Sequence, residues 1–77
     1  MRITGTQYSI EKKPKVLELR KAGQVIETYE FLGKTVNDLT EEIWESLRRK
    51  GVTVNKELLL EDMFKMFPGV RRYGPIK

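Results

Sequence analysis

Residues 15–31 read KVLELRKAGQVIETYEF, and this stretch decides the fold. Two runs rich in valine, leucine, isoleucine and aromatic residues, Lys15 to Lys21 and Gln24 to Phe31, flank the pair Ala22-Gly23. Residues of these types favour β-strands, and a short break that contains glycine is typical of a tight turn. The sequence therefore predicts an antiparallel β-hairpin.

The register of this hairpin has two solutions. With a two-residue loop, Leu19 faces Ile26 on one side of the sheet, and Glu18 lies opposite Glu27 on the other. Such a loop needs positive φ at both of its positions, which an alanine adopts poorly. A three-residue loop with Gly23 in the left-handed conformation is the alternative, and it would separate the two glutamates. The residues alone leave the choice open.

Upstream of the hairpin, residues 6–11 have weaker β character. Tyr8 and Ile10 alternate with polar residues, as in a strand with one buried face. Lys12-Lys13-Pro14 ends this segment, because proline lacks a backbone donor and holds the preceding residue in extended geometry. We therefore expect a short N-terminal strand.

The clearest element follows the hairpin and is a helix. Apolar residues recur there at the three-and-four spacing of one helical face: Val36, Leu39, Ile43 and Leu47, with Trp44 at the edge of the stripe. Thr35 can cap the start, with Asp38 three residues on in a capping-box arrangement. Gly51 supplies a left-handed residue at the end, where Val52 can fold back onto the last turn.

A second helix is predicted from Lys56 to Phe67, with Asn55 as its cap and Pro68-Gly69 as its stop. Its broad apolar face comprises Leu59, Leu60, Met63, Phe64, Met66 and Phe67. Leu58 falls on the opposite, polar face. An apolar residue in that position is available for a contact outside the core.

These elements predict an α+β fold, in which a small antiparallel sheet (the hairpin plus the N-terminal strand) is packed on one face by two helices. A chain of 77 residues has room for one core. Residues 1–69 are expected to form a single compact domain, and residues 70–77 a flexible basic tail. The expected core is Leu17, Leu19, Ile26, Val36, Leu39, Ile43, Leu47, Leu59, Met63 and Phe67.

The composition argues against most kinds of enzyme. The chain has no cysteine and no histidine, so it lacks a thiol nucleophile, the commonest acid–base group and the usual ligands of zinc, iron–sulfur and haem sites. Its glycines are scattered singly and form no phosphate-binding loop. The acidic pairs Glu18/Glu27 and Glu61/Asp62 are best interpreted as solvated surface groups. We expect no catalytic residue, no metal site and no cofactor.

The cellular compartment is indicated by what the sequence lacks. Absence of cysteine fits a reducing compartment. No apolar run approaches the length of about 20 residues that a membrane-spanning helix needs. The first residues lack the apolar centre of a signal peptide. We expect a small soluble protein of the cytoplasm.

One local similarity to a known family follows from the hairpin and the start of the first helix. Lys15 to Gly51, with Lys34-Thr35-Val36-Asn37-Asp38-Leu39 opening the helix, resembles the first half of β-grasp proteins such as ubiquitin-like sulfur carriers. In that family, a Thr-Val-x-Asp-Leu step commonly starts the helix. The rest departs from the pattern, because Leu58 to Phe67 has helical periodicity where β-grasp proteins have strands, and the Gly-Gly terminus of the carriers is missing. No function is carried over from this resemblance.

The leading functional hypothesis is a non-catalytic protein–protein interaction module, a regulatory or assembly factor that binds a protein partner or a second copy of itself as a homodimer. It is based on an apolar and aromatic surplus over what two short helices can bury. Aromatic residues are enriched at the centres of interfaces. The expected contact residues are Tyr29, Phe31, Trp44 and Leu58.

The alternative is a small nucleic-acid-binding protein, which the net charge of +4 favours. Basic side chains pair with phosphates, and a tyrosine ring can stack on a base. The expected contacts are Lys12, Lys13 and Lys15 near Pro14, together with Arg71, Arg72 and Tyr73 in the tail. A third basic cluster ends the first helix at Arg48, Arg49 and Lys50. Whether these clusters share one face is not decided by the sequence.

Overall fold

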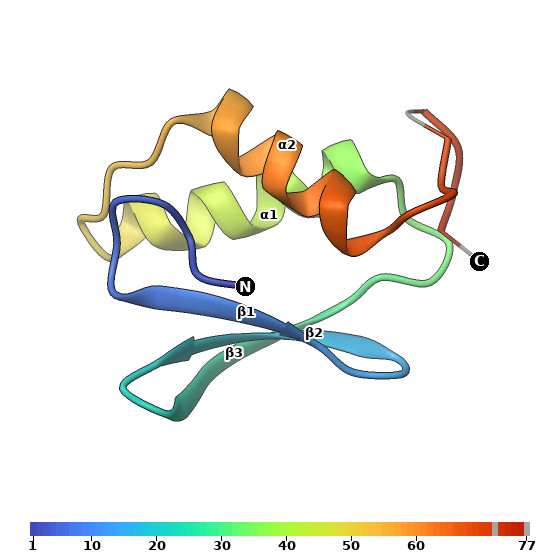
Figure 1. Ribbon diagram of the computed structural model, residues 1–77. Helices are drawn as coiled ribbons and strands as arrows, with labels where there is room; N and C mark the ends of the chain where they lie inside the picture. The colour runs from blue at the N-terminus through green and yellow to red at the C-terminus, as the bar shows by residue number, and fades with distance from the viewer. Residues whose placement is uncertain (72, 77) are drawn as a thin grey trace.

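The computed structural model describes residues 1–71 and 73–76, which form a sheet covered by two helices (Figure 1). The strands are β1 (Tyr8–Lys12), β2 (Val16–Lys21) and β3 (Gln24–Glu30), and the helices are α1 (Val36–Arg49) and α2 (Lys56–Met66). The sheet is antiparallel with the order β1-β2-β3. Both helices lie on the same side of it (Figure 1), which confirms the predicted α+β architecture.

The β2–β3 hairpin has the two-residue loop. Ala22 and Gly23 have φ of 52° and 79°, the left-handed values that a primed turn requires. The closing pair is Lys21 with Gln24, and Arg20 pairs with Val25. Ala22 is the only described residue other than glycine with positive φ. The turn therefore forms despite an unfavourable alanine.

A β-bulge then shifts the register of this hairpin. Leu19 pairs with Glu27 instead of Ile26, so Ile26 is an extra residue on β3. The pairing of Leu19 with Ile26, which a regular hairpin with a two-residue loop would give, does not form for this reason, and Ile26 is 40% exposed instead of buried in the predicted core. Glu18 pairs with Thr28, so the Glu18–Glu27 pair of that register does not form either.

The N-terminal segment covers the outer edge of β1. The Ile10 amide donates to the Met1 carbonyl at 2.7 Å, and the Ile3 amide donates to the Tyr8 carbonyl at 3.0 Å. Thr6 belongs to the turn that precedes β1, where its hydroxyl accepts from the Tyr8 amide at 3.0 Å. Among the described residues, no segment pairs with the outer side of β3. The sheet thus has one covered edge and one free edge.

The first helix has the predicted ends. The Thr35 hydroxyl accepts from the Asp38 amide at 3.0 Å. Gly51 has φ of 78°, and the Val52 amide donates to the Leu47 carbonyl at 2.9 Å, as a Schellman-type end requires.

The second helix also begins where predicted. The Asn55 side chain accepts from the amides of Glu57 and Leu58 at 2.9 and 3.1 Å. The helix ends at Met66, and Phe67 follows as its C-terminal cap. A helix here, where β-grasp proteins have strands, confirms the departure from that family.

The core lies between the sheet and the helices. Of the ten predicted core residues, all except Ile26 are buried. Six further apolar side chains join them: Ile3, Tyr8, Ile10, Tyr29, Phe31 and Ile76. Phe31 and Phe67 meet edge to face with ring centroids 5.3 Å apart. A small chain without disulfides therefore fills its core partly from outside its regular elements.

The C-terminal segment packs against the body of the protein, so the predicted boundary at residue 69 is wrong. Ile76 is buried, its amide donates to the Lys34 carbonyl at 2.8 Å, and its carbonyl accepts from the Gly33 amide at 2.8 Å. Pro75 forms a bridge with Thr35. These contacts attach the segment beside the start of α1. The predicted contact Arg72 and the last residue, Lys77, lie outside the described residues.

The strained turn generates a stability prediction. Asparagine tolerates the left-handed conformation better than alanine and is preferred at the first position of such turns. Ala22→Asn should therefore raise the free energy of unfolding by about 0.5–1 kcal/mol, measured by urea denaturation. Gly23→Ala, which places a Cβ at φ of 79°, should lower it. A less stable Ala22→Asn variant would contradict the proposed strain.

Candidate functional site

Two of the four predicted protein-contact residues lie in the core, which is a correction to the sequence interpretation. Tyr29 is 8% exposed and Phe31 is 3% exposed. The bulge turns Tyr29 toward the helices, and Phe31 packs on Phe67. Their rings leave too little free surface to anchor a partner.

The other two predicted contact residues remain accessible to different degrees. Trp44 is half-buried, and its indole nitrogen donates to the Val54 carbonyl at 2.9 Å. The Trp44 ring also lies beside the cationic groups of Arg48 and Lys56, at 5.6 and 5.0 Å from its centroid. Leu58 is 48% exposed on α2. Leu58 is therefore the better contact candidate of the two.

An apolar surface that the sequence did not reveal lies at the free edge of the sheet. Val25 is 45% exposed and Ile26 is 40% exposed, and they are neighbours at the bulge of β3. We call Val25, Ile26 and the following open side of β3 the β3 edge. Strict alternation along the strand would bury one of these two residues, so only the register shift leaves both accessible.

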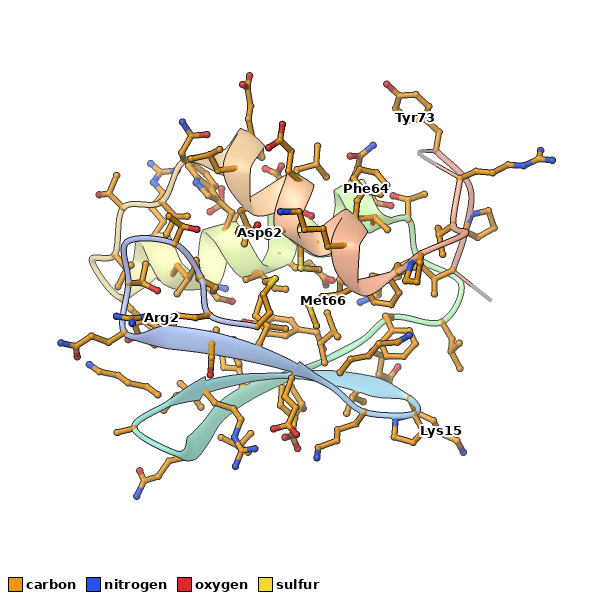
Figure 2. The ribbon with its side chains drawn as sticks, in the orientation of Figure 1. Arg2, Lys15, Asp62, Phe64, Met66 and Tyr73 are labelled. Carbon is orange, nitrogen blue, oxygen red and sulfur yellow. The ribbon has the colours of Figure 1, made fainter. Side chains whose placement is uncertain are left out.

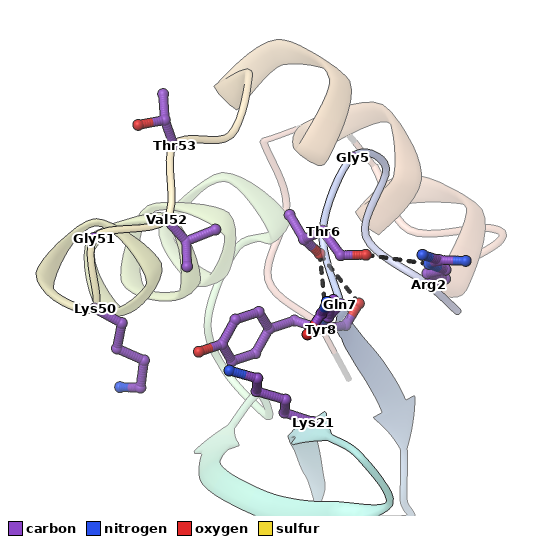
Figure 3. Close-up of a pocket in the computed structure, with 10 residues that line it drawn as sticks. All are labelled: Arg2, Gly5, Thr6, Gln7, Tyr8, Lys21, Lys50, Gly51, Val52 and Thr53. Carbon is purple, nitrogen blue, oxygen red and sulfur yellow. Dashed lines mark hydrogen bonds between the residues drawn. The ribbon is translucent and has the colours of Figure 1, made fainter.

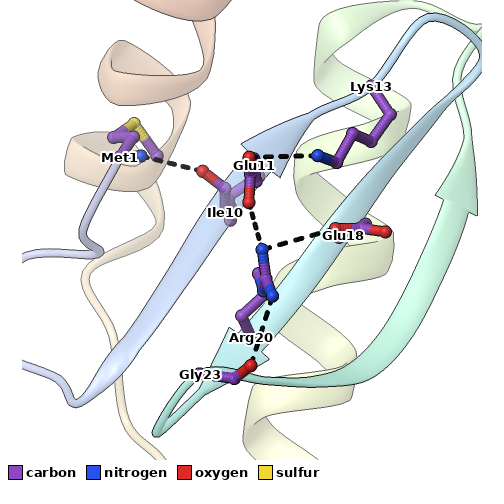
Figure 4. A network of polar contacts seen from close by, with 7 residues as sticks. All are labelled: Met1, Ile10, Glu11, Lys13, Glu18, Arg20 and Gly23. Carbon is purple, nitrogen blue, oxygen red and sulfur yellow. Dashed lines mark hydrogen bonds and ion pairs between the residues drawn. The ribbon is translucent and has the colours of Figure 1, made fainter.

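The open face of the sheet carries a charge network centred on Arg20 (Figure 4). The Arg20 guanidinium pairs with Glu11, lies 3.8 Å from Glu18 and donates to the Gly23 carbonyl at 3.2 Å. Lys13 adds a 3.1 Å contact with Glu11. The Arg20 and Lys13 hydrogen bonds lower the pKa of Glu11. The two glutamates that share a site are thus Glu11 and Glu18, on β1 and β2, and the two cations Arg20 and Lys13 together balance their charge.

A second cluster joins β3 to the end of α1. One Glu27 oxygen accepts from the hydroxyls of Tyr29 and Ser46, each at 2.9 Å, and the other pairs with the Lys50 ammonium. These groups, Lys50 first, lower the pKa of Glu27 to about 2. Burial chiefly, with the Glu27 carboxylate, raises the pKa of the Tyr29 hydroxyl. Glu27 is therefore an ionised structural anchor.

Two of the predicted nucleic-acid clusters lie at the same end of the molecule. Figure 2 shows Lys15, in the β1–β2 turn, and Tyr73, in the C-terminal segment, both at that end. Lys15, Arg71 and Tyr73 are exposed. Lys12 and Lys13 are partly engaged, because Lys12 lies over the Phe67 ring at 5.0 Å and Lys13 pairs with Glu11.

The third basic cluster lies at the opposite end. The helix α1 starts beside the C-terminal segment and runs away from it, so Arg48, Arg49 and Lys50 lie far from Lys15 and Tyr73 (Figures 1 and 2). The three clusters therefore do not form one continuous cationic face. Sequence reasoning treated the clusters by composition and had no means to place them.

At this opposite end, basic side chains line an open hollow of about 480 Å³, with Arg2 on one side of the N-terminal turn and Lys21 and Lys50 on the other (Figure 3). Its cations are Arg2 from the N-terminal segment, Lys21 from the end of β2 and Lys50 from the end of α1. Tyr8 and Thr53 also line it. We call this cavity the basic hollow. Sequence reasoning missed it because its cations come from three separate segments and only one, Lys50, belonged to a recognised cluster.

Neither a metal-binding group among the described residues nor a similar known protein indicates the function. Among the described residues, no three acidic, histidine or cysteine side chains come together in a group suited to a metal ion. None of the helices in that part of the chain is long and apolar enough to cross a bilayer. Comparisons with models of protein families, with curated proteins and with solved structures found no match. The functional inference therefore depends on the surfaces described above.

The Glu27 cluster predicts a specific acid sensitivity. Because folding lowers the pKa of Glu27 from 4.5 to about 2, its stabilising contribution is present above pH 4.5 and is lost as the pH falls toward 2. Over this range the wild type should lose about 1 kcal/mol more stability than Glu27→Gln, a modest value because the side chain is one-third exposed. Urea denaturation at several pH values measures this difference.

The matched control is Glu30→Gln, which removes an exposed carboxylate from the same strand. It should follow the wild-type dependence on pH. If Glu27→Gln also followed the wild-type curve, the anchor role of Glu27 would be wrong.

Proposed function

We propose that this protein is a non-catalytic protein–protein interaction module that binds an extended segment of its partner along the β3 edge. The observation that carries the proposal is the asymmetry of the sheet. The N-terminal segment pairs with β1, whereas β3 has an open side next to two exposed apolar residues. An open edge strand presents unpaired backbone donors and acceptors, to which another strand can add.

The side chains of β3 support such a contact. Val25 and Ile26 provide apolar area at the bulge, and Glu27 is held by Lys50 and Ser46, so that it does not repel an incoming strand. Backbone hydrogen bonds supply affinity in this mode, and the flanking side chains supply specificity. The added strand can come from another protein or from a second copy of the chain.

The non-catalytic part of the proposal is supported by the state of the carboxyl groups. The shifted ones, Glu11 and Glu27, have lowered pKa values and stay ionised at neutral pH. A general acid needs the opposite shift. We place the protein in the cytoplasm, since a chain without cysteine suits a reducing compartment.

The β3 edge is tested by a charge placed at the bulge. Ile26→Lys should weaken association by about tenfold or more, because a lysine in the contact must lose its hydration. Size-exclusion chromatography with light scattering over a concentration range measures self-association, and a pull-down with purified protein measures binding of a partner. Leu32→Lys, at a leucine beyond β3 that is 52% exposed against 40% for Ile26, is the matched control and should bind as the wild type does.

Leu58→Lys belongs in the same assays, since Leu58 is the accessible residue of the sequence-predicted set. A loss with Leu58→Lys but not with Ile26→Lys would move the contact to α2. A strict monomer that retains no partner would refute the interaction proposal.

Nucleic-acid binding is the second candidate, and one observation favours it. Lys15, Arg71 and Tyr73 are exposed. Figure 2 shows Lys15 on the sheet side and Tyr73 on the helix side of the same end of the molecule, so an extended nucleic acid that runs across this end would meet phosphate-pairing groups and a ring for stacking. The acidic residues of α1 limit the extent of this cationic surface. The helix starts at the same end of the molecule, and Glu41, Glu42 and Glu45 lie further along it.

A salt titration tests this candidate. Affinity for DNA or RNA should fall linearly with salt on a log–log plot, and Lys15→Gln combined with Arg71→Gln should reduce the slope by about two. Arg2→Gln combined with Lys21→Gln removes two charges at the opposite end and should leave the slope unchanged. Absence of any mobility shift at low salt would exclude this function.

A further inference from the structure

We propose that the basic hollow binds the phosphate group of a small phosphorylated molecule. This site is independent of the β3 edge, so either can fail without the other. The hollow lies between three segments, the N-terminal turn, the β2–β3 hairpin and the end of α1 (Figure 3). Each contributes one cation, namely Arg2, Lys21 and Lys50, and no carboxylate belongs to the described lining.

Two of these cations are not neutralised within the described part of the chain. Lys50 pairs with Glu27, but the ion pairs there include neither Arg2 nor Lys21. Like charges around one cavity repel each other, and an anion between them removes that repulsion. The uncompensated charge therefore points to an anionic occupant.

Local contacts hold both side chains at the hollow. The Arg2 Nε group donates to the Thr6 carbonyl at 3.1 Å, which restricts the guanidinium while its terminal nitrogens remain as donors. The Lys21 ammonium lies 5.3 Å from the centre of the buried Tyr8 ring. A forked guanidinium and a point-like ammonium are both groups that bind phosphate oxygens.

The C-terminal end of α1 lies at the hollow, and a helix C-terminus normally repels an anion; this repulsion is reduced here. Its carbonyls carry partial negative charge. Here the Gly51 and Val52 amides donate to the Arg48 and Leu47 carbonyls at 3.0 and 2.9 Å. The hydrogen-bonded cap thus offsets part of the helix dipole at the wall of the hollow.

The volume indicates the class of ligand. Small-molecule sites commonly measure about 300–1,000 Å³, and the hollow, which is open to solvent, measures about 480 Å³ and offers contacts beyond one phosphate group. Gln7 and Thr53 add uncharged polar groups, while Val52 and Tyr8 add apolar surface. A phosphate monoester with a small polar body, such as a sugar phosphate, fits this lining.

The experiment is a titration of the ¹⁵N-labelled full chain followed by NMR, at constant ionic strength. The probes are inorganic phosphate, ribose 5-phosphate and a single-stranded oligonucleotide. Saturable shifts should be confined to the amides of Gln7, Lys21 and Thr53 and their neighbours. Ribose 5-phosphate should bind at least as tightly as inorganic phosphate, and the oligonucleotide should not bind this site more tightly than either.

Paired variants give the site a matched control. Arg2→Gln with Lys21→Gln should weaken phosphate binding by about tenfold or more, as expected for the loss of charge-assisted hydrogen bonds. Lys15→Gln with Arg71→Gln removes the same charge at the other end and should change it less than about twofold. Circular dichroism confirms folding. If the first pair fails to fold, Lys21→Gln alone serves with the same expected direction.

Three results would overturn the proposal. Shifts that grow without saturation and spread over all exposed lysines would show screening by salt only. An equal loss in both double variants would show a dependence on net charge alone. Tight binding of the oligonucleotide without binding of either small phosphate would assign the hollow to nucleic acid instead.

Discussion

The bulge at Ile26 determines which side chains of β3 face the helices. Upstream of it, the turn at Ala22-Gly23 sets the closing pair, and downstream the one-residue shift places Glu27 opposite Leu19. With this register, Tyr29 enters the core and Glu27 reaches Ser46 and Lys50 of the first helix region. Without it, every side chain after Val25 would move to the other face of the sheet. The contact between sheet and helix, and the accessible surface at the bulge, both depend on this single extra residue.

The small size of the domain limits its stability. A domain of this length buries a limited apolar area, and no disulfide constrains its unfolded state. Ile3 and Ile76 increase the buried apolar area, although neither belongs to a named helix or strand. The same packing has functional consequences. The N-terminal segment protects one sheet edge and supplies Arg2 to the basic hollow, and the C-terminal segment brings Arg71 and Tyr73 to the end of the molecule that carries Lys15.

The charged side chains of the protein lie in separate regions of its surface. Arg20 and Lys13 balance the two glutamates on the open face of the sheet, and Lys50 balances Glu27 on the face that meets the helices. Among the described residues, Lys15 and Arg71 are exposed at one end and belong to no ion pair, and Arg2 and Lys21 line the basic hollow at the other. The β3 edge lies along a third surface, where apolar side chains and open backbone groups are available together. The proposed contacts with a strand, with an extended polyanion and with a small phosphate thus lie in distinct places, and their separation allows each to be tested alone.

The sequence by itself determined the local structure of this protein. Capping residues such as Thr35 and Asn55, the periodic apolar stripe of α1 and the turn at Ala22-Gly23 act over a few residues, so their patterns carried enough information to place every element and nine of the ten predicted core residues. Only the tertiary structure decided the bulge, the burial of Tyr29 and Phe31, and the assembly of Arg2, Lys21 and Lys50 around one hollow. These features arise from side chains of distant segments that compete for the same small core, and no short-range pattern records which of them is displaced to the surface.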